Sequence, residues 1–384
     1  MTTRISIICI WICFILLLVM GLIMVASTGS CVRGQELLPW YDTFLGKQCM
    51  FALLGLVIAI GLSRVDYHIW RQVVYVIWWV CLVLLACCFL PGIGKTINGE
   101  SRWISLGLTF QPSELAKITL MLTLAHWYTT HREMAGTFWK GFFWPGAILF
   151  GIPLMLILFE KDMGTAAALA LSGFCVMYVS GTRTWILLIS MLIAAIFLYV
   201  MMSGNENRMG RIYAWMSPEN YRQGAGLQQW AAGRAFLRGG VEGVGLGHGI
   251  EKYGTLPYAH TDFIFAEIGE EWGFIGSAGV VLLFLVMAFS TLMLAVQTRD
   301  TFGRILALGL GCTIFWPAML NVMVVTAILP NTGLPLPFIS SGGTNLVFTI
   351  ASIGLLTSIQ RFTPTIGQNY WPLRSLKEIK EPRL

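Results

Sequence analysis

The chain has 384 residues, of which 56% are hydrophobic and only 11% are charged, and its mean hydropathy is +0.72. Soluble domains carry about 25% charged residues, so this chain is predicted to be an integral membrane protein rather than a soluble one. Its apolar runs are continuous, which excludes a transmembrane β-barrel with alternating strands, and its net charge of +6 is explained by membrane topology, with no sign of nucleic-acid binding.

The apolar runs predict an all-α, polytopic fold with about ten transmembrane helices. Each run is close to the roughly 20 residues that a helix needs to cross the hydrocarbon core. The fourth run opens with the polar string Gln111-Pro-Ser-Glu114, in which proline and acidic residues mark a helix start. The predicted spans are 5–27, 44–62, 72–91, 112–130, 141–159, 164–181, 184–203, 271–296, 303–329 and 343–361.

The distribution of lysine and arginine predicts the orientation of these spans. Basic residues are more numerous in the connections on the side of Arg4 and the tail 362–384 than in the short loops opposite. Both termini are therefore predicted to be cytoplasmic, and the long loop 204–261 is predicted to be extracytoplasmic. No repeat or linker divides the chain, so residues 1–384 are predicted to form one membrane domain with a short basic tail.

Nine cysteines are present, mostly within apolar runs, where a cysteine acts as a small hydrophobic residue. Cys31 and Cys49 flank the first loop and are near enough in sequence to approach each other, but nothing in the function requires a disulfide. No Cys/His cluster has the spacing of a metal site.

Two polar segments stand early on the predicted outer face, where polar groups are costly and indicate function. In the first, Arg102 precedes Glu114 and Lys117, which share one face of a helix. That pair forms either an ion pair that fixes a helix end or one wall of a polar cavity. The second segment, Glu160-Lys-Asp162, is either a solvated turn or part of the same cavity.

The long loop is mildly basic and includes Arg208 and Arg211. Its glycine-rich stretch 239–249 allows backbone N–H groups to turn inward and form an anion-binding nest. The stretch matches neither a Walker A loop nor a dinucleotide fingerprint. A flexible connection is the alternative interpretation.

Asp262 stands where this polar loop meets an apolar helix. A carboxylate partly removed from water has its pKa raised toward that of a useful general base. Capping of the following helix is the structural alternative, and the two roles are compatible. Further on, the segment 330–345 contains three prolines and two adjacent glycines at membrane depth. Such backbone must line a cavity or be buried in protein, which predicts a cavity or re-entrant segment there.

Together these segments resemble the SEDS family (FtsW/RodA/SpoVE) of bacterial cell-wall synthesis proteins. The segments 21–27, 251–257 and 337–340 are more similar to its division branch than to its elongation branch. Lys161 and Ser341 depart from the family, which usually has proline and tyrosine at these positions. The matching strings are Arg102-Trp103, Gln111-Pro-Ser-Glu-Leu-Ala-Lys117, Asp162-Met-Gly-Thr-Ala166, Gly245-Leu-Gly247, Leu256-Pro-Tyr-Ala-His-Thr-Asp-Phe-Ile-Phe-Ala266 and Leu336-Pro-Phe-Ile-Ser-Ser-Gly-Gly343.

The resemblance implies a peptidoglycan glycosyltransferase of the bacterial cytoplasmic membrane, acting at the division septum. Its substrate would be lipid II, the undecaprenyl-pyrophosphate-linked disaccharide-pentapeptide. Its partners would be a class B penicillin-binding protein, other division proteins and membrane lipid. Transfer from an α-pyrophosphate to a β-linked glycan inverts the anomeric carbon, so one base suffices.

Asp262 is the residue expected to act as that base. Arginine suits the pyrophosphate because its planar fork can make paired hydrogen bonds, and the glycine-rich stretch is a further candidate. Glu114 and Asp162 would orient these cations or bind a divalent ion such as Mg²⁺ or Mn²⁺; no other cofactor is expected. The residues expected to contact the substrate are Arg102, Glu114, Lys117, Asp162, Arg208, Arg211, His260, Ser340, Gly342 and Gly343.

Three other functions compete with this one. A lipid II flippase would also need a polar cavity inside the membrane, but its charges should be spread along a path rather than gathered on one face. An elongation-type polymerase would carry out the same chemistry in a different complex. A non-catalytic scaffold for division proteins would have no need of these polar segments.

Overall fold

Each of the ten predicted apolar runs forms a helix. The computed structural model describes residues 3–29, 38–97, 100–106, 108–203, 206–222, 224, 226–253, 256 and 259–363. Cys31 and the basic tail beyond residue 363 lie outside these ranges, whereas Cys49 is a free, exposed thiol. The long helices are α1 (Thr3–Gly29), α2 (Phe44–Arg64), α3 (His68–Cys87), α4 (Pro112–Thr130), the π-helical η4 (Trp139–Phe150) running into α5 (Gly151–Phe159), α6 (Met163–Val179), α7 (Thr184–Ser203), α11 (Gly273–Gln297), α12 (Thr301–Val325) and α13 (Gly343–Phe362).

Seven of these described segments are long and apolar enough to cross a membrane: α1, α2, α3, η4 with α5, α11, α12 and α13. α6 and α7 contribute shorter apolar stretches, and α4 carries the charged residues Glu114 and Lys117. The predicted all-α polytopic membrane fold is therefore confirmed, and the chain is an integral membrane protein.

Polar side chains fix where several of these helices begin. Thr43 Oγ1 accepts a hydrogen bond from the backbone N–H of Gly46 at the start of α2. Asp162 and Asp300 accept the N–H groups of Thr165 and Gly303 in the same way, at 3.1 and 2.8 Å. Each cap satisfies an N–H group that the helix itself leaves unpaired. Asp162 is thus held at the first turn of α6.

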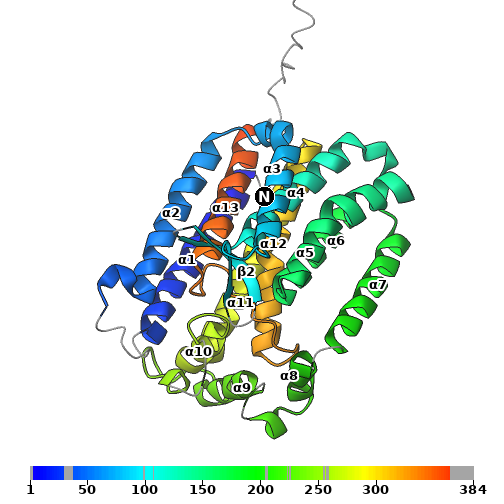
Figure 1. Cartoon of the computed structure of the whole chain (residues 1–384). Coiled ribbons are helices and arrows are strands. Elements are labelled where there is room, and N and C mark those ends of the chain that lie inside the picture. The colour runs from blue at the N-terminus through cyan, green and yellow to red at the C-terminus, as the bar shows by residue number, and fades with distance from the viewer. Residues whose placement is uncertain are drawn as a thin grey trace, which may run out of the picture.

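α12 lies at the centre of the bundle, where it packs against α4, α6, α11 and α13. Beside it, α2 and α13 run side by side (Figure 1). Their close approach depends on small residues, since a Cβ added to Gly354 would lie 2.6 Å from the backbone of Ala59. Close backbone approach through small residues is the usual way in which membrane helices pack without a hydrophobic driving force.

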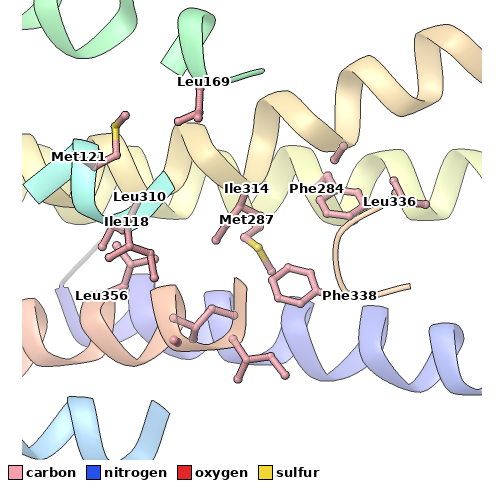
Figure 2. Packing of buried hydrophobic residues seen from close by; sticks show 14 of the residues in the cluster. Ile118, Met121, Leu169, Phe284, Met287, Leu310, Ile314, Leu336, Phe338 and Leu356 are labelled. Atoms are coloured by element: carbon pink, nitrogen blue, oxygen red, sulfur yellow. The ribbon is translucent and has the colours of Figure 1, made fainter. Parts of the chain in front are cut away.

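An irregular segment, 326–342, follows α12 and enters the interior of the bundle. Leu336 and Phe338 are buried in the core among Phe284 and Met287 of α11 (Figure 2). Phe338 also packs edge-on against Phe14 of α1, with ring centroids 5.3 Å apart. The predicted re-entrant or cavity-lining backbone is therefore confirmed, and its apolar side chains anchor it.

Short elements gather at one end of the bundle, where α8 (Glu206–Met216), α9 (Leu227–Gly239) and α10 (Ile264–Glu271) lie together (Figure 1). Two of them, α8 and α9, lie within the predicted long loop, which is therefore structured. A small antiparallel sheet of β1 (Gly94–Ile97), β2 (Glu100–Leu106) and β3 (Leu108–Phe110), in the order β1-β2-β3, was not predicted. Single turns complete the description: η2 (Trp40–Asp42), η3 (Arg132–Met134), η5 (Pro218–Tyr221) and η6 (Glu251–Tyr253).

Candidate active site

A polar cavity of about 330 Å³ opens at the end of the bundle that carries α8 and α10. Its walls come from segments far apart in the sequence: β2, the starts of α4, α6 and α9, α8, the turn before α10, and the irregular segment after α12. The cavity therefore brings together all the polar segments predicted to meet, except the glycine-rich stretch. The lining residues that carry charge or hydrogen-bonding groups include Arg102, Gln111, Glu114, Thr165, Arg211, Gln228, Thr261, Asp262, Asn331, Thr332, Ser341, Thr344 and Asn345.

Asp262 lies in the turn that precedes α10 and borders this cavity. Its Oδ2 is close to the backbone of Gly333, where an added Cβ would lie 3.4 Å from that oxygen. The pKa of Asp262 is raised to about 6, chiefly by burial and also by the charge of Asp162, against the lowering effect of the charges of Arg102 and Arg211 and of a hydrogen bond with Thr261. The N-cap position of α10 is Phe263, so the capping alternative for Asp262 is wrong.

Arg102 reaches the cavity from β2 and is held from behind by Asp162. Its Nη1 lies 3.5 Å from Oδ2 of Asp162, and the Asp162 side chain is only 2% exposed. Gln111 Nε2 donates to the same Oδ2 at 3.0 Å. Because its other oxygen caps α6, Asp162 orients Arg102 and Gln111 toward the cavity.

Glu114 and Lys117 form an ion pair on one face of α4, with 2.9 Å between Lys117 Nζ and Glu114 Oε2. The second carboxylate oxygen of Glu114 accepts a hydrogen bond of 3.2 Å from Asn345 Nδ2 on α13. The two interpretations, an ion pair and a cavity wall, are therefore both correct: the two residues form a buried ion pair, and Glu114 lines the cavity. Lys117 lies one turn deeper and lines a separate space of only about 10 Å³.

Arg211 on α8 is exposed and also lines the cavity. With Arg102 it makes up the pair of cationic side chains among the described lining residues. The side chain of Arg208, on the same helix, lies outside the described part of the chain.

The remaining predicted residues divide between cavity and support. Gly342 lines the cavity, whereas Gly343 packs against the ring of Phe51, 2.6 Å from where its Cβ would be. The ring of His260 lies against that of Phe44, with centroids 4.2 Å apart, and burial lowers the pKa of His260. Ser340 is buried and donates a hydrogen bond of 2.6 Å to the carbonyl oxygen of Thr261.

The glycine-rich stretch 239–249 packs against α10. Just after it, the backbone N–H groups of Ile250 and Glu251 donate to the two oxygens of Glu270, at 2.9 and 3.2 Å. Earlier in the stretch, Val244 and Gly245 donate their N–H groups to backbone carbonyls of α10. None of the described residues from 239 to 249 lines the cavity. The structure therefore does not bring this stretch to the cavity, and its role as a pyrophosphate site stays a prediction.

Gln228 and Asn321 are two residues at the site that the sequence did not single out. Gln228, in the first turn of α9, lines the cavity and accepts a hydrogen bond from Asn331. Asn321 lies within α12 and donates to the carbonyl oxygens of Asp262 and Leu334. A polar side chain inside a membrane helix is the signal that points to Asn321. Gln228 carries no such signal.

A model of the family described as cell cycle proteins, FtsW/RodA/SpoVE, matches residues 7–365. This chain belongs to that family. The family expected from the sequence motifs is thereby confirmed. Only the short N-terminus and the basic tail fall outside the match.

Curated relatives named as probable peptidoglycan glycosyltransferases FtsW are similar over most of the chain. The protein from Trichlorobacter lovleyi is 36% identical over 91% of this chain and 92% of its own length. The protein from Geobacter sulfurreducens is 36% identical over 88% of this chain and 91% of its own length.

Solved structures agree with the fold. A chain from a study of how a peptidoglycan synthase complex coordinates polymerisation and crosslinking has a TM-score of 0.73 and 26% identity, covering 91% of this chain and 96% of that one. The rod shape determining protein RodA of Thermus thermophilus has a TM-score of 0.69, covering 93% of this chain and 97% of its own. At 24% identity, RodA supports the fold alone.

The carboxylate oxygens of Glu114 and Asp162, which could bind a metal ion, already form hydrogen bonds or ion pairs within the protein. Both oxygens of Glu114 and both oxygens of Asp162 already have partners. Among the described residues there is no group of three histidine, cysteine or acidic side chains able to hold a metal ion. A divalent cation here would therefore need ligands from the substrate as well as from the protein, which is the usual way in which Mg²⁺ binds beside phosphates.

Proposed function

We propose that this chain is a peptidoglycan glycosyltransferase that polymerises lipid II into glycan strands during cell division. The observation that carries the proposal is Asp262, a carboxyl group with a raised pKa in a cavity flanked by Arg102 and Arg211. A pKa of about 6 leaves Asp262 mostly ionised at neutral pH and still basic enough to accept a proton. The curated relatives named FtsW support this activity and the division role.

In this mechanism Asp262 accepts the proton of the acceptor sugar hydroxyl. The hydroxyl oxygen then attacks the anomeric carbon of the donor, and the bond between that carbon and the pyrophosphate oxygen breaks. Undecaprenyl pyrophosphate leaves with the bonding electron pair, and the anomeric configuration inverts in this one displacement. No covalent glycosyl-enzyme is required.

Arg102 and Arg211 are suited to the leaving group because guanidinium groups bind phosphate oxygens in pairs. Asp162 and Gln111 keep Arg102 in place before the substrate arrives, which lowers the cost of ordering it. Glu114, held by Lys117 and Asn345, forms the floor of the cavity. If a divalent cation takes part, it would neutralise the pyrophosphate and would be held largely by substrate oxygens.

The shape of the cavity favours a polymerase over a flippase. A flippase needs a continuous polar path across the membrane. Beside Glu114 and Lys117, the described residues enclose a separate space of about 10 Å³, which holds about one water molecule. A scaffold, in turn, would not require a half-buried carboxyl group between two arginines.

The membrane setting follows from the same proposal. Lipid II is polymerised on the outer leaflet, so the cavity would face outward, with both termini cytoplasmic and the protein placed at the septum. A class B penicillin-binding protein would crosslink the strands. The similar fold of a chain from a peptidoglycan synthase complex supports such a partner.

The decisive experiment reconstitutes the purified full chain in liposomes with lipid II, with and without the transpeptidase partner, and measures glycan strands on gels. We expect strands from the wild type and none from Asp262→Asn. Asp42→Asn serves as a matched control, because Asp42 forms an exposed pair with Lys47. Rapid transbilayer movement of lipid II without strand formation would instead identify a flippase.

A further inference from the structure

Asn321 occupies an unusual position in the membrane part of the protein. It lies within α12, is 1% exposed, and is surrounded by buried residues of that helix. Its side-chain amide donates two hydrogen bonds, to the carbonyl oxygen of Asp262 at 2.7 Å and to that of Leu334 at 2.6 Å. A polar side chain in a spanning helix is costly and is retained where it satisfies other buried groups.

The two carbonyl groups belong to different segments that border the cavity. Asp262 lies in the turn before α10, and Leu334 lies in the irregular segment after α12. Neither carbonyl oxygen lies within a regular helix. Each therefore needs a hydrogen-bond partner other than the backbone N–H groups of a helix. By binding both, Asn321 sets the separation between the backbone of Asp262 and the backbone next to Gly333.

A second buried side chain holds the residue before Asp262. Ser340 Oγ donates to the carbonyl oxygen of Thr261 at 2.6 Å and accepts the N–H of Leu336 at 2.8 Å. Ser341 adds a backbone hydrogen bond of 3.0 Å to the carbonyl oxygen of His260. Three consecutive carbonyl groups, at 260, 261 and 262, are therefore fixed by α12 and the irregular segment.

We propose that Asn321 and Ser340 form a carbonyl clamp that positions Asp262 for proton transfer. The clamp consists of the two side chains and the carbonyl oxygens of Thr261 and Asp262. It rests on the proposed role of Asp262 as the base. Asn321 and Ser340 act as positioning residues through the backbone and touch no reacting atom. Ser340, predicted to contact the substrate, takes this supporting role instead.

The clamp makes a specific kinetic prediction. A base displaced by about 1 Å loses about a hundredfold in rate, whereas substrate binding elsewhere in the cavity is unaffected. Asn321→Ala should therefore lower kcat by about ten- to a hundredfold with little change in KM. Because the environment of Asp262 changes, the acid limb of the pH profile of kcat/KM should also move.

The test compares Asn321→Ala and Ser340→Ala with Thr291→Val, all in the full chain with lipid II. Thr291 is a buried residue of α11 whose hydroxyl bonds only within its own helix among the described contacts, so its loss controls for general destabilisation. Thermal stability in detergent is measured on the same samples. Ser340→Ala keeps the test open if Asn321→Ala does not fold.

Each outcome separates the clamp from the base. Normal kcat in folded Asn321→Ala and Ser340→Ala, with Asp262→Asn inactive, would overturn the clamp and leave the base in place. A raised KM at unchanged kcat would also overturn it, since that result indicates substrate binding. Full activity of Asp262→Asn would overturn the proposed base and the clamp together. A lowered kcat with an unchanged KM and a moved acid limb supports the clamp.

Discussion

Arg102 and Asp162 meet behind the wall of the cavity, with Nη1 and Oδ2 3.5 Å apart. Their side chains come from β2 and from the start of α6, and Asp162 is the more deeply buried of the two. The contact joins an arginine that faces the cavity to a carboxylate that also raises the pKa of Asp262. One buried residue thus affects both the cation and the base of the site.

The first prediction concerns this shared carboxylate. Asp162→Asn keeps an N-cap for α6, because asparagine caps as well as aspartate, but removes the negative charge beside Arg102. Since that charge raises the pKa of Asp262, its loss should lower that pKa and shift the acid limb of kcat/KM to lower pH. KM for lipid II should rise because Arg102 loses the carboxylate that orients it. An unchanged acid limb in a stable variant would contradict this coupling.

The pH dependence of the wild type is the second prediction. The folded pKa of Asp262 is about 6, so the ionised base is lost as pH falls through 6. We expect kcat/KM to fall about tenfold for each pH unit below that value and to reach a plateau above it. Polymerisation rates from pH 5 to 8 measure the profile. An acid limb of kcat/KM near pH 4 would contradict the burial of Asp262 that the structure indicates.

Glu267 provides a prediction about stability rather than catalysis. It is fully buried in α10 with both carboxylate oxygens unpaired among the described contacts. Burial, together with the charges of Glu270 and Glu271, raises its pKa to about 8. The folded pKa exceeds the ordinary value of 4.5, so stability is highest at low pH and is lost as pH rises from 4.5 through 8.

Glu267→Gln should remove this loss. The variant should gain on the wild type by up to about 1.4 kcal/mol for each pH unit across that range. Its advantage should therefore be largest above pH 8 and small near pH 4.5. Melting temperatures in detergent at several pH values provide the measurement. A constant difference across pH would show that Glu267 is ionised in the folded protein.

The packing of α2 on α13 supplies the fourth prediction. Gly354→Ala places a Cβ 2.6 Å from the Ala59 backbone, and backbone cannot move aside without shifting a helix. We expect the free energy of unfolding to fall by about 1–3 kcal/mol, which is the usual effect of overpacking. Gly61→Ala is the control, because nothing lies within 4 Å of its added Cβ. Equal melting temperatures for the two variants would show that the helices separate easily.

The ten helices could be predicted because lipid forces long apolar runs into one conformation. The cavity could also be predicted in part, since Arg102, Glu114 and Asp262 are charged where charge is costly. The sheet β1–β3 was missed because its strands are short and do not alternate clearly. Helix α9 was missed despite a signal, as Ala231, Ala232 and Ala235 occupy a buried face that ends at consecutive glycines.

The individual hydrogen bonds between distant segments could not be predicted from the sequence. Asn321 has its effect through carbonyl oxygens of residues 262 and 334, and no local pattern reports such a pairing. The glycine-rich stretch shows the opposite failure. Val244 and Gly245 of this stretch donate their N–H groups to backbone carbonyls of α10, and the carboxylate of Glu270 is bound by the N–H groups that follow, at residues 250 and 251.

That internal carboxylate has a consequence for inhibition. The backbone N–H groups of residues 250 and 251 bind Glu270. These two N–H groups are therefore not available to free phosphate or pyrophosphate. In the proposed reaction, the pyrophosphate product competes with the donor in the cavity of Arg102 and Arg211. Undecaprenyl pyrophosphate that dissociates slowly would therefore inhibit the next reaction cycle, because it occupies the site to which the next donor must bind.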